Sequence, residues 1–152
     1  MVAQMKINPY FFVSLTTLAL FLFVVPVHAQ GPGDDSGQSE KYRAVFDDVQ
    51  TGISSGDITL FAHHFASKVA VNLRDTESGT FSANQMYYVL HGYFKIRQFG
   101  RFEFSTFGES DSNPYASGTA ESMANGSREI VQVYVALSLD GDKYVITQLT
   151  IY

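Results

Sequence analysis

Apolar residues recur at spacings of three and four in the first half of the chain, which is the repeat of helices with one buried side. The first such stripe consists of Tyr42, Val45, Phe46, Val49 and Ile53. After a break at residues 54–56, Asp57 is placed to cap a second, short helix that contains residues 58–65. A third helix is predicted after Ser82, with Gln85 completing a capping box. The pattern therefore predicts three helices.

The pattern changes to an alternation of apolar and polar positions in a short segment at residues 69–73 and again from residue 99 onward, which predicts strands. Asn-Gly at 125–126 and Asp-Gly at 140–141 supply the positive φ angles that tight hairpin turns require. Four sequential antiparallel strands are therefore expected after the helices. Helices and strands that are segregated in this way predict an α+β domain, with the helices covering one face of a curved sheet.

Each of the last two predicted strands has one face that is mostly apolar and one face that is mixed. On residues 129–139 the apolar face consists of Val131, Val133, Val135, Leu137 and Leu139, and on the last strand the corresponding set is Val145, Thr147, Leu149 and Ile151. The mixed faces carry Gln132, Tyr134 and Gln148, which are candidates for ligand contacts if that face lines a small pocket. An ordinary sheet with one face exposed to solvent and no pocket gives the same pattern.

The N-terminal region has the pattern of an export signal. Lys6 precedes an uncharged apolar run at residues 11–25, and small residues end at Ala29, after which cleavage is predicted. An uncleaved anchor would need a longer apolar run, about 20 residues. Residues 30–40 are rich in glycine, serine and acids and are expected to be a flexible leader, followed by one domain over residues 41–152.

Composition limits the cellular compartments and the classes of partner that are expected for this chain. The chain has no cysteine, so it can form neither disulfides nor thiolate metal sites, and with an export signal it is expected to be periplasmic or secreted. Its net charge is −5 without a basic cluster, which argues against nucleic acid as a partner. No membrane association is expected after cleavage, and no cofactor is implied.

The adjacent histidines in LFAHHF offer the most reactive side chains of the first half. On a helix, His63 would point to solvent and His64 would lie at the border of the apolar face, so the two could not share a target. Helical zinc sites place two histidines four residues apart, and this spacing therefore predicts no metal site. His91 is expected on the surface, whereas His64 stays a candidate for proton transfer.

The order of these elements resembles the NTF2-like superfamily. The resemblance rests on LFAHHF, VAVNL, FSANQMYYVLHGYF and the four strands that end in YVITQLTI, and it is closest to small exported bacterial proteins of unknown function. It implies a cone in which a bent antiparallel sheet wraps around about three N-terminal helices. NTF2-like enzymes such as ketosteroid isomerases and polyketide cyclases hold an aspartate or histidine base inside that cone.

Glu121, Glu103 and Asn72 are the polar residues of strands that come nearest to this requirement, and Glu121 and His64 are the candidate bases. No aspartate stands at a comparable position, so the chain leans toward a noncatalytic role. Three hypotheses follow: a noncatalytic domain that binds a small apolar ligand or a protein partner; an isomerase, cyclase or hydrolase; and a structural homodimerisation module.

Overall fold

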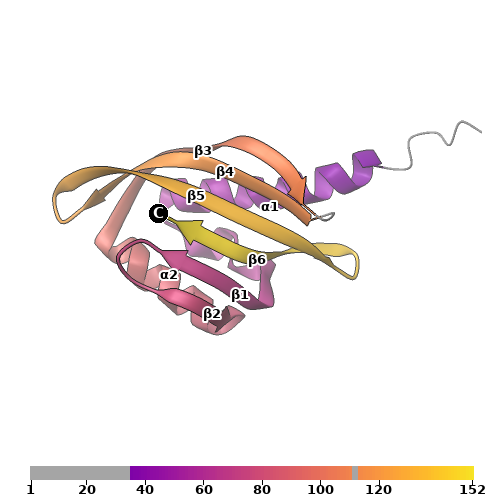
Figure 1. Ribbon diagram of the computed structural model, residues 1–152, viewed down its shortest axis with the longest axis horizontal. Helices are drawn as coiled ribbons and strands as arrows, with labels where there is room; N and C mark the ends of the chain where they lie inside the picture. Colours follow the sequence, from indigo (N-terminus) through magenta and orange to yellow (C-terminus); the bar gives the residue numbers. More distant parts are fainter. Residues whose placement is uncertain (1–34, 111–112) are drawn as a thin grey trace, which may run out of the picture. The chain divides into compact units, whose positions relative to one another are not determined.

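The computed structural model describes residues 35–152 with the exception of 111–112. Two α-helices, α1 (Asp35–Ser55) and α2 (Ala83–Ile96), and two short 3-10 helices, η1 (Ile58–Leu60) and η2 (Ala62–His64), accompany six strands. The strands are β1 (Phe65–Leu73), β2 (Ser78–Ser82), β3 (Arg97–Ser110), β4 (Asn113–Ala124), β5 (Ser127–Asp140) and β6 (Lys143–Ile151). They form one sheet in the order β2-β1-β6-β5-β4-β3 (Figure 1).

The α+β class and the run of four antiparallel strands, β3 to β6, are confirmed. The sheet is mixed rather than antiparallel throughout, because β1 pairs with β6 in parallel. The expected second helix is wrong in type: residues 58–64 form two 3-10 turns. Asp57 caps the first of them as predicted, and its carboxylate accepts a hydrogen bond from the Thr59 N–H at 2.9 Å.

The first helix begins at Asp35 rather than near Glu40, so it includes the second half of the segment expected to be a leader. The export signal and its cleavage point lie outside the described residues. Neither described α-helix combines the length and apolar character that crossing a bilayer requires. The capping box of α2 is confirmed, with Ser82 and Gln85 bonding to each other's backbone N–H groups.

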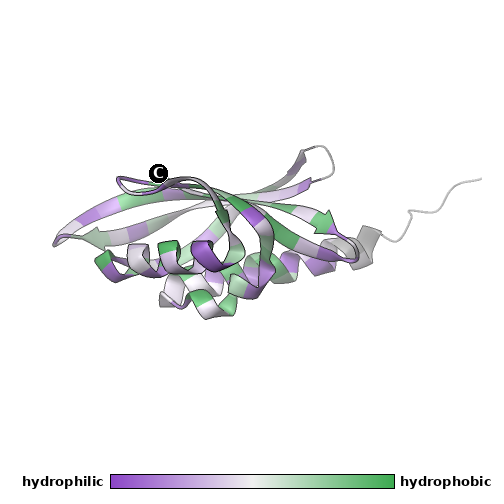
Figure 2. Ribbon diagram, turned by 90° about the horizontal axis from the view of Figure 1, so that it is seen from below, coloured by the Kyte–Doolittle hydropathy of each residue, from purple (hydrophilic) through white to green (hydrophobic). Residues whose placement is uncertain are grey.

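Both helices lie on one side of the sheet (Figure 2). α1 packs across β3 and reaches β6, whereas α2 packs on β1, β2 and β3. Side chains of α1 also bond to the backbone of the edge strand β3: Gln50 accepts from the Phe104 N–H at 2.9 Å, and the Ser54 hydroxyl accepts from the Phe102 N–H at 3.0 Å. Backbone N–H groups that would lack a partner at the edge of the sheet thus bond to α1 and hold it in place.

The core lies between the sheet and the helices. Its largest fully buried side chains are Phe46, Ile53, Phe61, Met86, Leu90, Phe102, Leu137, Ile146, Leu149 and Ile151. Val131, Val133, Val135 and Leu137 point into it as the alternation predicted, whereas Leu139 is 50% exposed.

The predicted phase of β6 is wrong in its first half. Tyr144 and Ile146 are buried together with Leu149 and Ile151, while Val145 and Thr147 are only half-buried. The physical reason is a bulge: Leu137 pairs with Ile146 and Ala136 with Gln148, so Thr147 has no partner in the ladder and the alternation changes phase there.

One turn is also displaced from its prediction. Asn125 and Gly126 form the β4–β5 turn with φ angles of 51° and 79°, as an Asn-Gly turn requires. The β5–β6 turn consists of Gly141 and Asp142 rather than Asp140 and Gly141, because Asp140 still pairs with Lys143.

Candidate functional site: a groove beside a histidine pair

The interior of the domain is apolar. Among the described residues, the only charged side chain that is fully buried is that of Arg97, and Ser122 is the other buried polar residue. No carboxylate or imidazole of the described chain therefore lies deep between sheet and helices. A general base of the kind that the NTF2-like resemblance implies would need such a position, where burial shifts its pKa toward working range.

Glu121 lies on the face of β4 that points away from the helices. It is exposed and forms an ion pair with Arg128 across the β4–β5 hairpin. Glu103 is likewise exposed and pairs with Arg101 on its own strand. Asn72 is exposed on β1. These three residues face solvent instead of an enclosed site.

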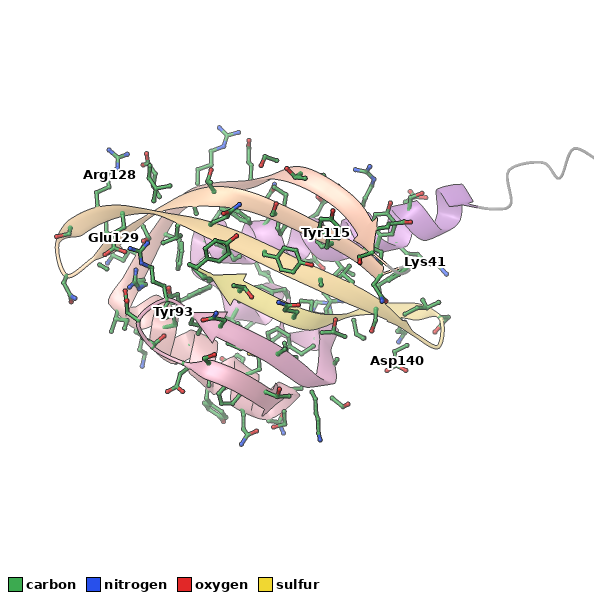
Figure 3. All side chains as sticks on the ribbon, in the orientation of Figure 1. Lys41, Tyr93, Tyr115, Arg128, Glu129 and Asp140 are labelled. Carbon is green, nitrogen blue, oxygen red and sulfur yellow. The ribbon has the colours of Figure 1, made fainter. Side chains whose placement is uncertain are left out.

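The predicted ligand contacts come together on the same outward face. Gln132 and Tyr134 are neighbours on β5, and Tyr134 stacks on Tyr115 of β4 with ring centroids 5.7 Å apart and planes 29° apart. Gln148 of β6 pairs with Ala136 and donates a hydrogen bond to Thr150 at 3.4 Å. Figure 3 shows Tyr115 on this uncovered face of the sheet. The three residues share this surface, on which Gln132 and Gln148 are exposed and Tyr134 is half-buried.

A hollow lies between α1, η2 and the β5–β6 turn, with a volume of about 520 Å³. We call it the α1–β6 groove. Its wall includes the buried side chains of Val45 and Tyr144, and Tyr144 packs edge to face against Tyr42 with centroids 5.6 Å apart. The remaining lining residues are Lys41, Ala44, His63, His64, Asp142, Lys143 and Val145. The groove therefore has an apolar wall and a charged rim.

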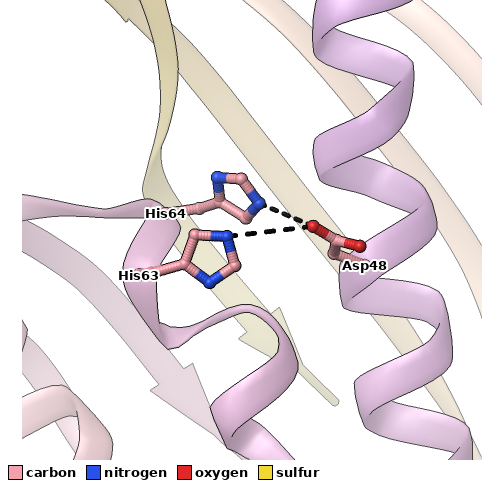
Figure 4. A group of neighbouring side chains, drawn as sticks. All are labelled: Asp48, His63 and His64. Atoms are coloured by element: carbon pink, nitrogen blue, oxygen red, sulfur yellow. Dashed lines mark hydrogen bonds and ion pairs between the residues drawn. The ribbon is translucent and has the colours of Figure 1, made fainter.

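His63 and His64 line this groove, and their imidazoles lie beside Asp48 of α1 (Figure 4). The Nε2 atom of His64 lies 2.8 Å from Asp48 Oδ2, and the Nε2 atom of His63 lies 3.9 Å from the same oxygen. The imidazole centroids are 3.8 Å apart. His63 is exposed, as predicted, and His64 lies at the border of the core with 20% of its side chain exposed.

The expectation that the two histidines cannot share a target is wrong. It assumed an α-helix, whereas residues 62–64 form a 3-10 turn that ends directly at β1. The turn is held by the His64 N–H, which donates to the Phe61 carbonyl at 3.0 Å, and by the buried rings of Phe61 and Phe65 on either side. Both imidazoles are thereby turned toward α1.

Arg97 forms a second polar cluster at the junction of α2 and β3. Its guanidinium is 6% exposed and donates to Glu129 at 2.7 Å and to Asp75 at 2.9 Å. It also lies over the ring of Tyr93, 5.3 Å from the centroid. Burial raises the pKa of Tyr93, although the charge of Arg97 opposes this shift. Two carboxylates around one guanidinium leave no net positive charge to attract an anion, so this cluster is structural.

Sequence reasoning missed Asp48 and Arg97. Asp48 follows Asp47 on the polar side of a predicted helix, and nothing in the local pattern shows which strand or turn that side meets. Arg97 is a single basic residue between α2 and β3, with its partners 22 and 32 residues away. Such contacts depend on the tertiary fold, and no local signal could have identified them.

The fold resembles that of known NTF2-like proteins. A designed NTF2-like protein is similar with a TM-score of 0.58 and 14% identity, over 76% of this chain and 99% of that one. A candidate polyketide cyclase from Xanthomonas campestris is similar with a TM-score of 0.54 and 13% identity, over 74% of this chain and 90% of that one. At these identities the likeness concerns the fold alone, and it shows that the fold is NTF2-like.

Residues 46–152 match the family described as "Domain of unknown function (DUF4783)", and the chain belongs to that family. A crystal structure of a DUF4783 family protein from Bacteroides ovatus is similar with a TM-score of 0.59 and 17% identity, over 68% of this chain and 90% of that one. A comparison with curated proteins gives no match. The predicted resemblance to NTF2-like proteins of unknown function is thus confirmed in fold and family.

Proposed function

We propose that this protein is a noncatalytic, exported binding domain that holds the apolar part of a small ligand in the α1–β6 groove. The observation that carries the proposal is the combination of a filled apolar interior with an open groove outside it. The proposed binding site therefore lies outside the centre of the cone, which is where NTF2-like enzymes hold their catalytic base.

The noncatalytic part of the proposal rests on the described interior. Its one buried charge, Arg97, is neutralised by Glu129 and Asp75, and guanidinium is too weak an acid to exchange protons near neutral pH. Of the two candidate bases, Glu121 is exposed in an ion pair with Arg128, and His64 sits at the groove with Asp48. Neither lies in an enclosed site: Glu121 is exposed, and His64 lines the open groove outside the core.

The chemistry of the α1–β6 groove suits a ligand with an apolar body and one polar end. Val45, Ala44 and Tyr144 offer apolar contact, while Lys41 and Lys143 stand at the rim. Its volume falls within the range of about 300–1,000 Å³ that small-molecule sites occupy. The signal pattern of residues 1–29 supports the exported part of the proposal. The intact mass of the protein recovered from its natural compartment tests it, because cleavage would remove that segment.

The binding test uses anilinonaphthalene sulfonate, a fluorescent probe with an apolar body and an anionic end. Ala44→Trp places an indole in the groove from an exposed helix position and is expected to weaken probe binding at least tenfold. Lys95→Trp adds the same indole at an exposed position of α2 and is the matched control, with expected binding unchanged. Equal probe binding by both variants and the parent protein would contradict the proposed site.

A protein partner or a second copy of the chain is the alternative function, and one observation favours it. The outward face of the sheet carries exposed Met123 and Ile130, and Tyr152 is 54% exposed at its end. Sedimentation velocity tests this alternative: a monomer at all concentrations excludes a stable homodimer, whereas a dimer that Ile130→Lys dissociates would locate the interface on this face.

A further inference from the structure

We infer that Asp48, His63 and His64 form a binding site for a transition-metal ion, with Zn²⁺ as the ion that fits best. The site goes beyond the proposed function and does not depend on it, because it rests on these three side chains alone. It gives the groove a chemistry that apolar contacts do not supply.

The ligand atoms are close enough to share one ion. One ligand atom from each of the three residues can be chosen so that all lie within 4.8 Å of one another. Two of the separations are 2.8 and 3.9 Å, from His64 Nε2 and His63 Nε2 to Asp48 Oδ2. Ligand atoms around tetrahedral zinc, at bond lengths of about 2.0–2.1 Å, are about 3.3 Å apart. The observed values bracket that distance, so small side-chain rotations complete the geometry.

The chemistry of the three groups also fits. Two imidazoles and one carboxylate are zinc ligands of ordinary type, and imidazole favours Zn²⁺ over Mg²⁺ or Ca²⁺. Within the described part of the chain, no lysine or arginine forms an ion pair with Asp48, so its carboxylate faces only the two imidazoles. A cation placed between the three groups would satisfy the carboxylate and both nitrogen lone pairs together.

The backbone holds the ligands in place before an ion arrives. In the sequence His64 is flanked by the buried residues Phe61 and Phe65, and Asp48 precedes buried Val49 on α1. The backbones of Asp48 and His64 are therefore held beside buried residues, whereas the side chains of His63 and Asp48, which are 61% and 47% exposed, must lose freedom on binding. Three protein ligands leave a fourth position of a tetrahedral ion open. Because His63 and His64 line the α1–β6 groove, that position adjoins the groove.

The test is calorimetric titration of the purified, metal-free protein with ZnCl₂. One ion per chain is expected to bind to the parent protein. His63→Ala, which changes an exposed side chain, and Asp48→Asn, which keeps the shape of the residue, are each expected to weaken binding at least tenfold. His91→Ala removes the exposed histidine of α2 and is the matched control, with unchanged affinity expected.

Two further measurements keep the inference falsifiable. Circular dichroism establishes that each variant is folded, and the visible absorption of bound Co²⁺ reports tetrahedral nitrogen and oxygen coordination in the parent. Failure of the parent to bind Zn²⁺, or equal weakening by His91→Ala and His63→Ala, would overturn the site. Loss of Zn²⁺ binding in His63→Ala with probe binding retained would separate the metal site from the proposed ligand groove.

Discussion

Gly52 of α1 and Phe61 lie so close together that a methyl group added to Gly52 would stand 2.3 Å from the Cδ1 atom of the Phe61 ring. Phe61 is fully buried and directly precedes the turn that carries both histidines. The absence of a side chain at residue 52 therefore lets the 3-10 segment approach α1, and this approach brings the histidine pair to Asp48.

Gly52→Ala is expected to destabilise the protein although alanine is the better helix former. The helical preference for alanine is about 1 kcal/mol, whereas overpacking a core typically costs about 1–3 kcal/mol. Because the Phe61 ring cannot move into the packed core, the clash should outweigh the preference, with a net loss of up to about 2 kcal/mol. Urea unfolding measures it.

Gly92→Ala on α2 is the matched comparison, because a methyl group there meets nothing within 4 Å. The same substitution should then stabilise the protein by up to about 1 kcal/mol. Opposite signs for the two variants would establish that the contact with Phe61, and not helix propensity, governs residue 52. A gain in stability for Gly52→Ala would contradict the close approach.

Arg97→Met is expected to lower the free energy of unfolding by about 2–4 kcal/mol, because it leaves Glu129 partly buried without its cation. Adding Glu129→Met should recover part of that loss, since the unpaired charge is then removed as well. Thermal unfolding of the two single variants and the double variant forms the required cycle. Additive losses would mean that the pair is not coupled.

Tyr93 should make the protein sensitive to alkali. Burial raises its pKa above the ordinary value of about 10, so the hydroxyl ionises at lower pH in the unfolded chain than in the folded one. The stabilising contribution is therefore complete below about pH 10 and is lost as pH rises through the higher pKa of the folded state. Tyr93→Phe should reduce this alkaline loss, whereas Tyr88→Phe, at a 72% exposed position, should not.

The same variant has an expected effect at neutral pH. The Tyr93 hydroxyl is buried and has no hydrogen-bond partner among the described residues. Removing an unsatisfied buried hydroxyl should leave stability unchanged or raise it by about 1 kcal/mol. A loss of more than that in Tyr93→Phe, measured by urea unfolding, would mean that the hydroxyl is in fact bonded.

Ser82→Ala is expected to cost about 1 kcal/mol, because the Ser82 hydroxyl caps α2 and also bonds to Gln85 at 2.9 Å. Ser78→Ala, at the exposed start of β2, changes the same chemical group and should leave stability within about 0.5 kcal/mol of the parent. Equal effects of the two variants would contradict the cap.

Local patterns in the sequence determined the α+β class, the cap at Ser82, the Asn-Gly turn and the buried faces of β1 and most of β5. These features depend on neighbours within a few residues, which periodicity and turn chemistry report directly. The same reasoning named His64 and described His63 as exposed, and the structure agrees on both exposures.

Tertiary structure alone decided the parallel pairing of β1 with β6, the phase of β6 after its bulge, and the meeting of Asp48 with both histidines. An alternating pattern cannot reveal where a strand gains an unpaired residue, since each half still alternates. Nor can a polar helix face show what it will meet. Asp48 and His64 are brought together because Gly52, which has no side chain, leaves room for the Phe61 ring, and the sequence positions of these two residues predict nothing about one another.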